Sequence, residues 1–204
     1  MCSSDLASIS GFGQTGPYRE RGGYDTIAQG MSGIMSATGN AGAPPAKAGV
    51  PMIDIGTGLF TAYGILSAYI HRQKTGEGQY LDMALLDCGI AFSIWEAAAV
   101  FSGGEAPSPF GSMHRRNQPH GAFKTADGYL CIAADQQHHW RAFCDLTGLS
   151  HLLEDPRFLT NRDRVEHLDQ LQAALEAVLG EKSSAEWHER LVKAGRSEEH
   201  TSEL

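Results

Sequence analysis

The sequence is short of cysteine and of positive charge, and each shortage excludes a class of protein. Four cysteines are scattered over 204 residues, without the spacing of a zinc site or a disulfide framework. That usage is typical of a reducing compartment, so we expect a cytoplasmic protein without a metal site. The formal net charge is -8, so we expect no general nucleic-acid-binding surface.

One stretch of the chain combines a near absence of charge with a strongly apolar composition. Between Lys47 and His71 the only charged residue is Asp54, and the stretch from Ile55 to Ile70 is apolar but interrupted by glycine. This stretch is a little short for a membrane span. We therefore expect a buried core helix and no membrane partner.

Asp54 stands where this apolar stretch begins, and the pattern predicts a helix from there to about Lys74. A carboxylate in the first turn of a helix lies at the positive end of the helix dipole, which favours its ionised form. Small neighbours, Gly56 and Gly58, would let a ligand come close. Asp54 is therefore a candidate nucleophile, with a helix N-cap as the alternative.

The two ends of the chain have an unusual relation at the nucleotide level. Residues 196–204 can be encoded by a nucleotide string whose reverse complement contains a possible coding string for residues 1–6. Both strings also look like a common sequencing adapter. We therefore expect both ends to be translated adapter and residues 7–195 to be an internal piece of a longer protein. Finding these codons in the genomic reading frame would contradict this.

Periodicity along the chain predicts an α/β protein. We expect strands at Ala7–Ser10 and Gln79–Met83, and a hairpin around Asp127 and Gly128. Helices are expected, besides the one after Asp54, at about residues 25–38, 85–101, 136–147, 161–179 and 184–194, the first of them capped by Asp25. We place a domain boundary near residues 105–120.

The segment from Gly11 to Gly16 matches the G-x-G-x-x-G pattern of dinucleotide-binding loops. That pattern requires a helix to open within it, whereas Pro17–Gly23 reads as further loop. We therefore do not expect a nicotinamide cofactor. Gly11, Gly13 and Gly16 would serve tight turns or close backbone approach, and turn geometry alone is enough to explain them.

Several motifs in order make the chain resemble the family III CoA-transferases, the group containing formyl-CoA transferase and carnitine CoA-transferase. The likeness covers nearly all of residues 7–195. It rests on residues 8–17, 23–25, 28–29, 54–58, 71–72, 75–76, 78–79, 86–87, 120–123 and 125–128. The resemblance implies that residues 7–115 are the C-terminal part of a large Rossmann-like domain. Residues 116–195 would then be part of a smaller α+β domain.

The resemblance also implies a chemistry. The aspartate at the Asp54 position attacks an acyl-CoA thioester, and an enzyme–CoA thioester forms, with helix-terminal N–H groups stabilising the oxyanions. Tyr24 and Asp25 would line the substrate pocket, with a capped helix start as the alternative. The glycines expected to meet substrate and CoA are Gly11, Gly13, Gly16, Gly56 and Gly58. Substrates would be an acyl-CoA and a carboxylic acid acceptor, with no further cofactor.

Two other functions remain open. The related α-methylacyl-CoA racemases use a His–Asp pair, but this chain has Tyr24 where their pattern has histidine. Tyrosine is a poor base near neutral pH without a large pKa shift, so transfer is preferred. The second alternative is an inert product. In the family the dimer is interlocked and most contacts to the CoA nucleotide precede Ala7, so we expect the 204-residue chain to be inactive.

Overall fold

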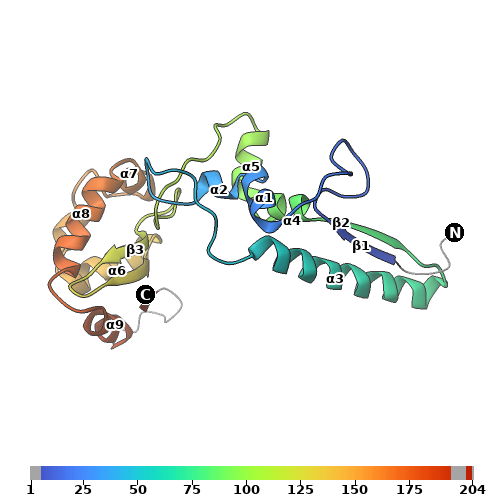
Figure 1. The fold of residues 1–204 in the computed structure, drawn as a ribbon. Coiled ribbons are helices and arrows are strands. Elements are labelled where there is room, and N and C mark those ends of the chain that lie inside the picture. The colour runs from blue at the N-terminus through green and yellow to red at the C-terminus, as the bar shows by residue number, and fades with distance from the viewer. Residues whose placement is uncertain (1–5, 194–200, 204) are drawn as a thin grey trace. The chain divides into compact units, whose positions relative to one another are not determined.

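The computed structural model describes residues 6–193 and 201–203 (Figure 1). The chain divides into two compact units, Met1–Gly111 and Ser112–Leu204. Helices and strands occur in both units, which confirms the α/β class. The predicted adapter segments lie mostly outside the described residues; only Leu6 and Thr201–Glu203 belong to the described part, and the adapter origin stays a prediction.

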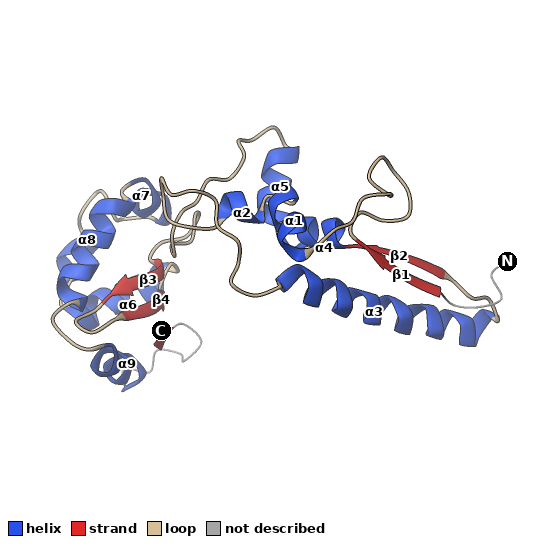
Figure 2. Cartoon of the chain, viewed as in Figure 1, coloured by secondary structure: helices blue, strands red, loops and turns tan. Residues whose placement is uncertain are grey.

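The first unit is built on a pair of parallel strands. β1 (Leu6–Ser10) pairs with β2 (Tyr80–Ala84), so that Ser8 lies opposite Asp82. Both strands lie within one residue of their predicted positions. The crossover between them contains α1 (Asp25–Met31), α2 (Ile34–Ala37) and α3 (Met52–Thr75), and α3 runs along the strand pair (Figure 2). The apolar residues at the end of β1 favour a buried strand, and this prediction is wrong, since Ile9 is 55% exposed. A strand pair covered by one helix keeps its other face open.

Two predicted helices of this unit are each broken in two. Gly33 separates α1 from α2 because its φ of 85° lies in the left-handed region. Ser93 separates α4 (Leu85–Phe92) from α5 (Ile94–Phe101). Its hydroxyl donates to the carbonyl of Gly89 at 2.9 Å and to that of Ser32 at 3.2 Å. Such side-chain bonds to the backbone compete with a regular helix.

The helix predicted around Asp54 is confirmed as α3, which ends at Gly76 with a φ of 77°, a common helix terminus. Its burial differs from the prediction. Only one face is buried, through Ile53, Gly56, Thr57, Thr61 and Ala68. Large apolar side chains elsewhere on α3 are exposed, among them Leu59 at 68% and Tyr63 at 74%. The helix is long and apolar enough to cross a membrane, but core helices of soluble proteins pass the same test.

A small apolar cluster joins α1, α2, α3 and α4. It contains Ala28, Ile34, Ile53, Leu85 and Cys88. Gly89 lets α4 approach the other helices, because a Cβ there would lie 2.7 Å from the hydroxyl of Ser32 and 2.9 Å from the Cδ1 of Ile53. The start of α3 is thereby packed from the side of α1 and α4.

The second unit has an antiparallel sheet covered by helices. β3 (His120–Lys124) and β4 (Tyr129–Ala133) form the predicted hairpin, and β5 (Thr201–Glu203) pairs with β4. The helices are α6 (Gln137–Thr147), α7 (Asn161–Glu166), α8 (Leu168–Leu179) and α9 (Ser184–Lys193), with a short 3-10 helix at Ser150–Leu153. The helix predicted for residues 161–179 is therefore interrupted, at His167.

The core of the second unit is large and aromatic. Trp140, Phe123 and Trp187 are almost completely buried, and the indole N–H of Trp187 donates to the carbonyl of Leu179 at 2.8 Å. The cluster continues through apolar residues of the sheet and of α6, α8 and α9. This unit therefore buries its own hydrophobic faces within the described residues.

Candidate active site

Asp54 lies in the first turn of α3, two residues after the helix begins at Met52. Pro51 occupies the N-cap position, so the alternative of Asp54 as N-cap is wrong. The side chain is exposed. Within the part of the chain that the structure describes, its carboxylate accepts no hydrogen bond. Asp54 therefore presents an unengaged carboxylate to the surroundings of the helix start.

Asp25 holds the beginning of α3 from a neighbouring helix. Its carboxylate is 8% exposed, and Oδ1 accepts the backbone N–H of Ile53 at 2.9 Å and that of Asp54 at 3.3 Å. The prediction that Asp25 caps its own helix is wrong, because it is the first residue of α1 and Tyr24 is the N-cap there. The carboxylate instead satisfies the otherwise unpaired N–H groups of a helix that starts almost thirty residues later.

The N–H groups of this helix start are therefore already engaged. The N–H of Met52 donates to the carbonyl of Val50 at 2.8 Å, and that of Ile55 donates to the carbonyl of Pro51 at 3.1 Å. Together with the two bonds to Asp25, these account for the first four helical residues. The expectation that helix-terminal N–H groups would stabilise an oxyanion is wrong for this arrangement.

Gln29 is a buried polar residue that the sequence reasoning did not assign to the site. It is 0% exposed, and its Nε2 donates to Asp25 Oδ2 at 2.6 Å. Its Oε1 accepts the backbone N–H of Ala48 at 2.8 Å. The available signal was the spacing, because residues four apart on a helix lie on one face, where a glutamine and an aspartate can hydrogen-bond.

The glycine loop, residues 11–16, contacts the chain just before Tyr24. A Cβ on Gly11 would lie 2.5 Å from the Cα of Gly23, so the two backbones are in direct contact. The carbonyl of Gly11 also accepts the N–H of Leu86 at 3.1 Å. The loop therefore closes on itself just before Tyr24, whose side chain is 75% exposed. These contacts fix the chain just before Tyr24 and Asp25, and the Asp25 carboxylate in turn bonds to the start of α3.

The middle of the glycine loop is held by a residue of β2. Gly13 and Gly16 have φ values of 83° and 81°, which favour glycine and suit tight turns. The N–H of Gln14 donates to Asp82 Oδ2 at 2.8 Å, so a carboxylate on β2 holds this loop. Asp82 was not among the predicted site residues. No helix opens within the loop, as expected for a false match to the dinucleotide pattern.

The two glycines of α3 differ from each other. A Cβ on Gly56 would overlap the ring of Phe92 and lie 2.9 Å from Cys88 Sγ, so Gly56 serves the packing of α3 on α4. A Cβ on Gly58 would meet nothing within 4 Å. Cys88 is the buried core thiol that the sequence predicts, and burial raises its pKa. Of these two glycines, Gly58 is the one with room for a ligand.

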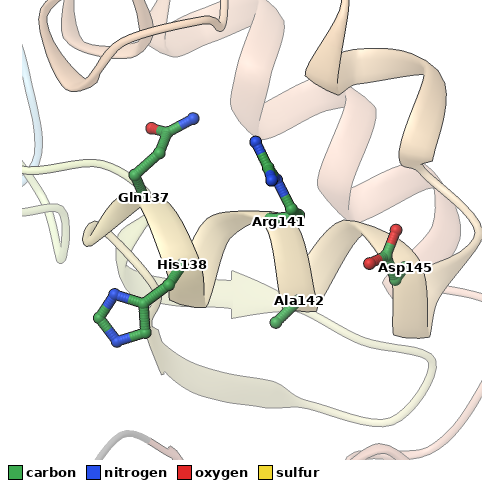
Figure 3. Close-up of a pocket in the computed structure, with 5 residues that line it drawn as sticks. All are labelled: Gln137, His138, Arg141, Ala142 and Asp145. Carbon is green, nitrogen blue, oxygen red and sulfur yellow. The ribbon is translucent and has the colours of Figure 1, made fainter.

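One face of α6 in the second unit borders a separate hollow of about 480 Å³. Figure 3 shows Gln137, Arg141 and Asp145 on one side of the helix and His138 on the other. Asp145 accepts a hydrogen bond from the hydroxyl of Ser150 at 3.0 Å. None of the predicted site residues lines this hollow.

Fold and site together define an α/β protein with an accessible carboxylate at the start of a long helix. The comparison with known families is more specific. The chain belongs to CoA-transferase family III, whose family model matches residues 6–197. This confirms the resemblance that the sequence motifs indicated.

Named relatives agree with this assignment. The succinate–glutarate CoA-transferase of Agrobacterium fabrum is 42% identical over 160 residues, which cover 78% of this chain and 40% of the relative. The acetyl-CoA:oxalate CoA-transferase of Acetobacter aceti is 40% identical over 190 residues, covering 93% of this chain and 49% of the relative. The chain thus spans less than half the length of either relative.

A solved structure shows the same fold. The crystal structure of a CAIB/BAIF family protein from Brucella suis matches with a TM-score of 0.79 and 39% sequence identity. The match covers 94% of this chain and 50% of the solved chain. Almost all of this chain therefore has a counterpart in that structure.

Proposed function

We propose that the full-length protein containing this chain transfers coenzyme A from an acyl-CoA to a carboxylic acid, with Asp54 as nucleophile. The observation that carries the proposal is the exposed carboxylate of Asp54 in the first turn of α3, free of hydrogen bonds within the described residues. A nucleophile must be accessible and unengaged, and its position must be well defined. Membership of the family supplies the class of reaction.

The proposed reaction begins with attack of an Asp54 oxygen on the thioester carbonyl. The carbon–sulfur bond breaks, CoA leaves as a thiolate, and an acyl–aspartyl anhydride forms. The thiolate then attacks the aspartyl carbonyl and releases the acyl group as a carboxylate, leaving an aspartyl–CoA thioester. An acceptor carboxylate reverses the two steps, so a new acyl-CoA leaves and Asp54 is restored. The reaction needs no redox partner and no cofactor beyond the CoA substrate.

Residues near the start of α3 are proposed to support the reaction at Asp54. Tyr24 is exposed beside Asp25 and is proposed to contact the acyl group or the thioester. Open space at Gly58 is proposed to admit the substrate along α3. The oxyanions of the proposed reaction require donors other than the first N–H groups of α3, since these are already bonded. The relatives' names point to small carboxylic acids as substrates in those proteins, and we propose the same class here.

The 204-residue chain by itself is proposed to be inactive. It spans about 40% to 50% of the length of the relatives it matches, and much of the apolar surface of α3 is exposed. We also propose that the full-length protein is an interlocked homodimer, as the family resemblance implies. Size-exclusion chromatography with light scattering tests the dimer, and a monomeric, active full-length protein would contradict it.

The test uses the recovered full-length reading frame and this chain side by side. Transfer is followed by mass spectrometry with an acyl-CoA and a panel of small carboxylic acids, and the protein is examined for a CoA adduct on Asp54. We expect transfer and the adduct in the full-length protein, and loss of both in Asp54→Ala. Turnover by the 204-residue chain would contradict the proposal that this chain is inactive by itself. Exchange of the α-proton without CoA transfer would favour the racemase alternative.

A further inference from the structure

We infer that Gln29 is a positioning residue for Asp54: with Asp25 it forms a buried clamp that sets the start of α3. The inference rests on the proposed function, because it assigns a role in the same site. Within the described residues, Gln29 makes no hydrogen bond to the Asp54 side chain. It acts through the Asp25 carboxylate and the loop that leads into α3.

The hydrogen bonds of Gln29 join α1 to the loop that leads into α3. The Nε2 group donates to Asp25 Oδ2 at 2.6 Å and, over a longer 3.5 Å, to the carbonyl of Val50. The Oε1 atom accepts the N–H of Ala48 at 2.8 Å. The side chain is completely buried, so water does not replace these partners. An unpaired amide at this depth would be costly, so these bonds hold the loop at residues 48–50 against α1.

The clamp determines where the Asp54 backbone lies. Gln29 occupies one oxygen of Asp25, and the other oxygen accepts the N–H groups of Ile53 and Asp54. The Asp54 side chain has no hydrogen bond of its own among the described residues, so its carboxylate is placed by its backbone. Displacement of a reacting group by about 1 Å can reduce a rate about 100-fold. Loss of the clamp should therefore lower the rate of attack more than it weakens substrate binding.

The first test is Gln29→Met, which keeps the length of the side chain and removes its polar atoms. Asp25 Oδ2 and the N–H of Ala48 lose their partner. In the full-length protein we expect kcat to fall about 10- to 100-fold with the KM for acyl-CoA unchanged, as expected for an interaction that matters in the transition state. Formation of the Asp54–CoA adduct in a single turnover should slow by the same factor.

The second test is Gln29→Glu, which makes the role of the hydrogen bonds visible in a pH profile. A neutral carboxyl group can donate one hydrogen bond to Asp25 and accept one from Ala48, as Gln29 does. When ionised it can only accept, and it lies against the Asp25 carboxylate. We expect the ratio of variant to wild-type kcat to rise as pH falls. Division by the wild-type rate removes the pH dependence that the two proteins share. The ionisable side chains on the segments packed around Gln29 are those of Tyr24, Asp25, Lys47, Asp54, Asp87 and Cys88.

Thr61→Val is the matched control. Thr61 is also buried, and its hydroxyl donates to the carbonyl of Thr57 at 2.7 Å, two turns beyond Asp54 on the same helix. The variant removes one buried hydrogen bond from α3 without touching the clamp. We expect a lower thermal midpoint with wild-type kcat. A loss of kcat in Thr61→Val as large as in Gln29→Met would show that any loosening of α3 reduces the rate, and would overturn the inference.

The outcomes separate the inference from the proposed function. An inactive wild-type full-length protein, or an active Asp54→Ala variant, would refute the proposed function. The clamp alone would be overturned if the full-length protein transfers CoA and requires Asp54, but Gln29→Met keeps the wild-type kcat. A ratio of Gln29→Glu to wild-type kcat that does not change with pH would also overturn it. Slower adduct formation, unchanged KM and rescue at low pH would support it.

Discussion

At the scale of single residues, two glycines of α3, Gly56 and Gly58, differ in their surroundings. Gly56 lies against the ring of Phe92 and the thiol of Cys88, so packing of α3 on α4 already explains it. Gly58 has open space around it, and no packing contact requires a glycine there. A glycine inside a helix costs about 0.5–1 kcal/mol relative to alanine. Packing among the described residues does not explain Gly58, whereas the proposed approach of substrate along α3 would.

Gly58→Ala therefore has opposite expected effects on stability and activity. We expect an increase of about 0.5–1 kcal/mol in the free energy of unfolding, because alanine is the better helix former. In the full-length protein we expect a lower kcat/KM for acyl-CoA, because the methyl group enters the proposed substrate space. Urea unfolding and steady-state kinetics measure the two effects. A stabilised variant with full activity would show that substrate does not approach Gly58.

Asp127 contributes a stability that depends on pH. The pKa of its carboxyl group is lowered below the ordinary value of 3.8, first by the backbone N–H of Ser184, which donates to Oδ1 at 2.8 Å. The hydroxyls of Ser184 and Thr125 lower it further. A lowered pKa in the folded state gives stability that is present above the ordinary value and is lost as pH falls through the folded value.

Asp127→Asn tests this contribution while keeping the shape of the side chain. We expect a lower thermal midpoint than wild type near pH 7, because the amide oxygen accepts the Ser184 N–H without a negative charge. The difference should shrink as pH falls below about 4, because the unfolded wild-type protein takes up a proton on Asp127 before the folded protein does. Calorimetry over a pH series gives the difference. A constant difference at all pH values would mean that the charge of Asp127 does not contribute.

At the scale of elements, the helices stop where a local group competes with the helical hydrogen bonds. The sequence pattern predicts long helices at residues 25–38 and 85–101, because apolar spacing continues through both. Gly33 and Ser93 break them, the first through its backbone angle and the second through hydroxyl bonds to two carbonyls. Apolar periodicity finds which face a helix buries, but it does not detect a single residue whose backbone or side chain prefers another partner.

Arg164 on α7 organises the elements of the second unit. Its guanidinium group is 0% exposed and donates to the carbonyls of Gln118, Asp135 and Phe158, besides the side chain of Gln137. Arginine suits this place because its planar group carries five donors in a fixed geometry, whereas lysine has three donors at one point.

Arg164→Lys is therefore expected to lower the free energy of unfolding by about 1–3 kcal/mol, since buried acceptors lose their donors. Tryptophan fluorescence during urea unfolding reports the change, because the Arg164 guanidinium lies 5.2 Å from the ring of Trp140. Arg162→Lys on the same helix is the control, as its ion pair with Glu166 is exposed. We expect a change below about 0.5 kcal/mol there. Equal losses in both variants would contradict the role of the buried network.

At the scale of the whole molecule, the two units differ in how much apolar surface they bury. The cluster in the first unit is small, and large side chains such as Leu59, Tyr63 and Phe101 are exposed. The second unit has a core with buried tryptophan and phenylalanine side chains. Since burial of apolar surface is the main stabilising contribution to folding, the second unit should be the more stable one in this chain.

Hydrogen exchange of the 204-residue chain, followed by mass spectrometry, tests this difference. We expect amides of α3, α4 and α5 to exchange faster than those of β3, β4, α6 and α8, because local stability follows buried contacts. The measurement is made at two protein concentrations, since self-association through exposed apolar side chains would slow exchange in the first unit. Equal protection of the two units at the lower concentration would contradict the prediction.

The sequence by itself determined the class of fold, most of the elements and the family. Strand alternation, the long apolar stretch after Asp54 and a series of spaced motifs are local signals, and each is readable without knowing which segments meet. The same signals placed Asp54 in the first turn of a helix.

Only the tertiary structure decided how that helix start is held. Asp25 precedes α3 by almost thirty residues, yet its carboxylate accepts the N–H groups of Ile53 and Asp54. The buried Gln29 side chain donates a hydrogen bond to the other oxygen of that carboxylate. Local propensity predicted Asp25 as the cap of its own helix, because a sequence pattern does not contain the distance between segments. That distance follows from the packing of α1 on α3 and α4 and from the contact of Gly11 with Gly23. These contacts determine which N–H groups are occupied and which carboxylate is left accessible.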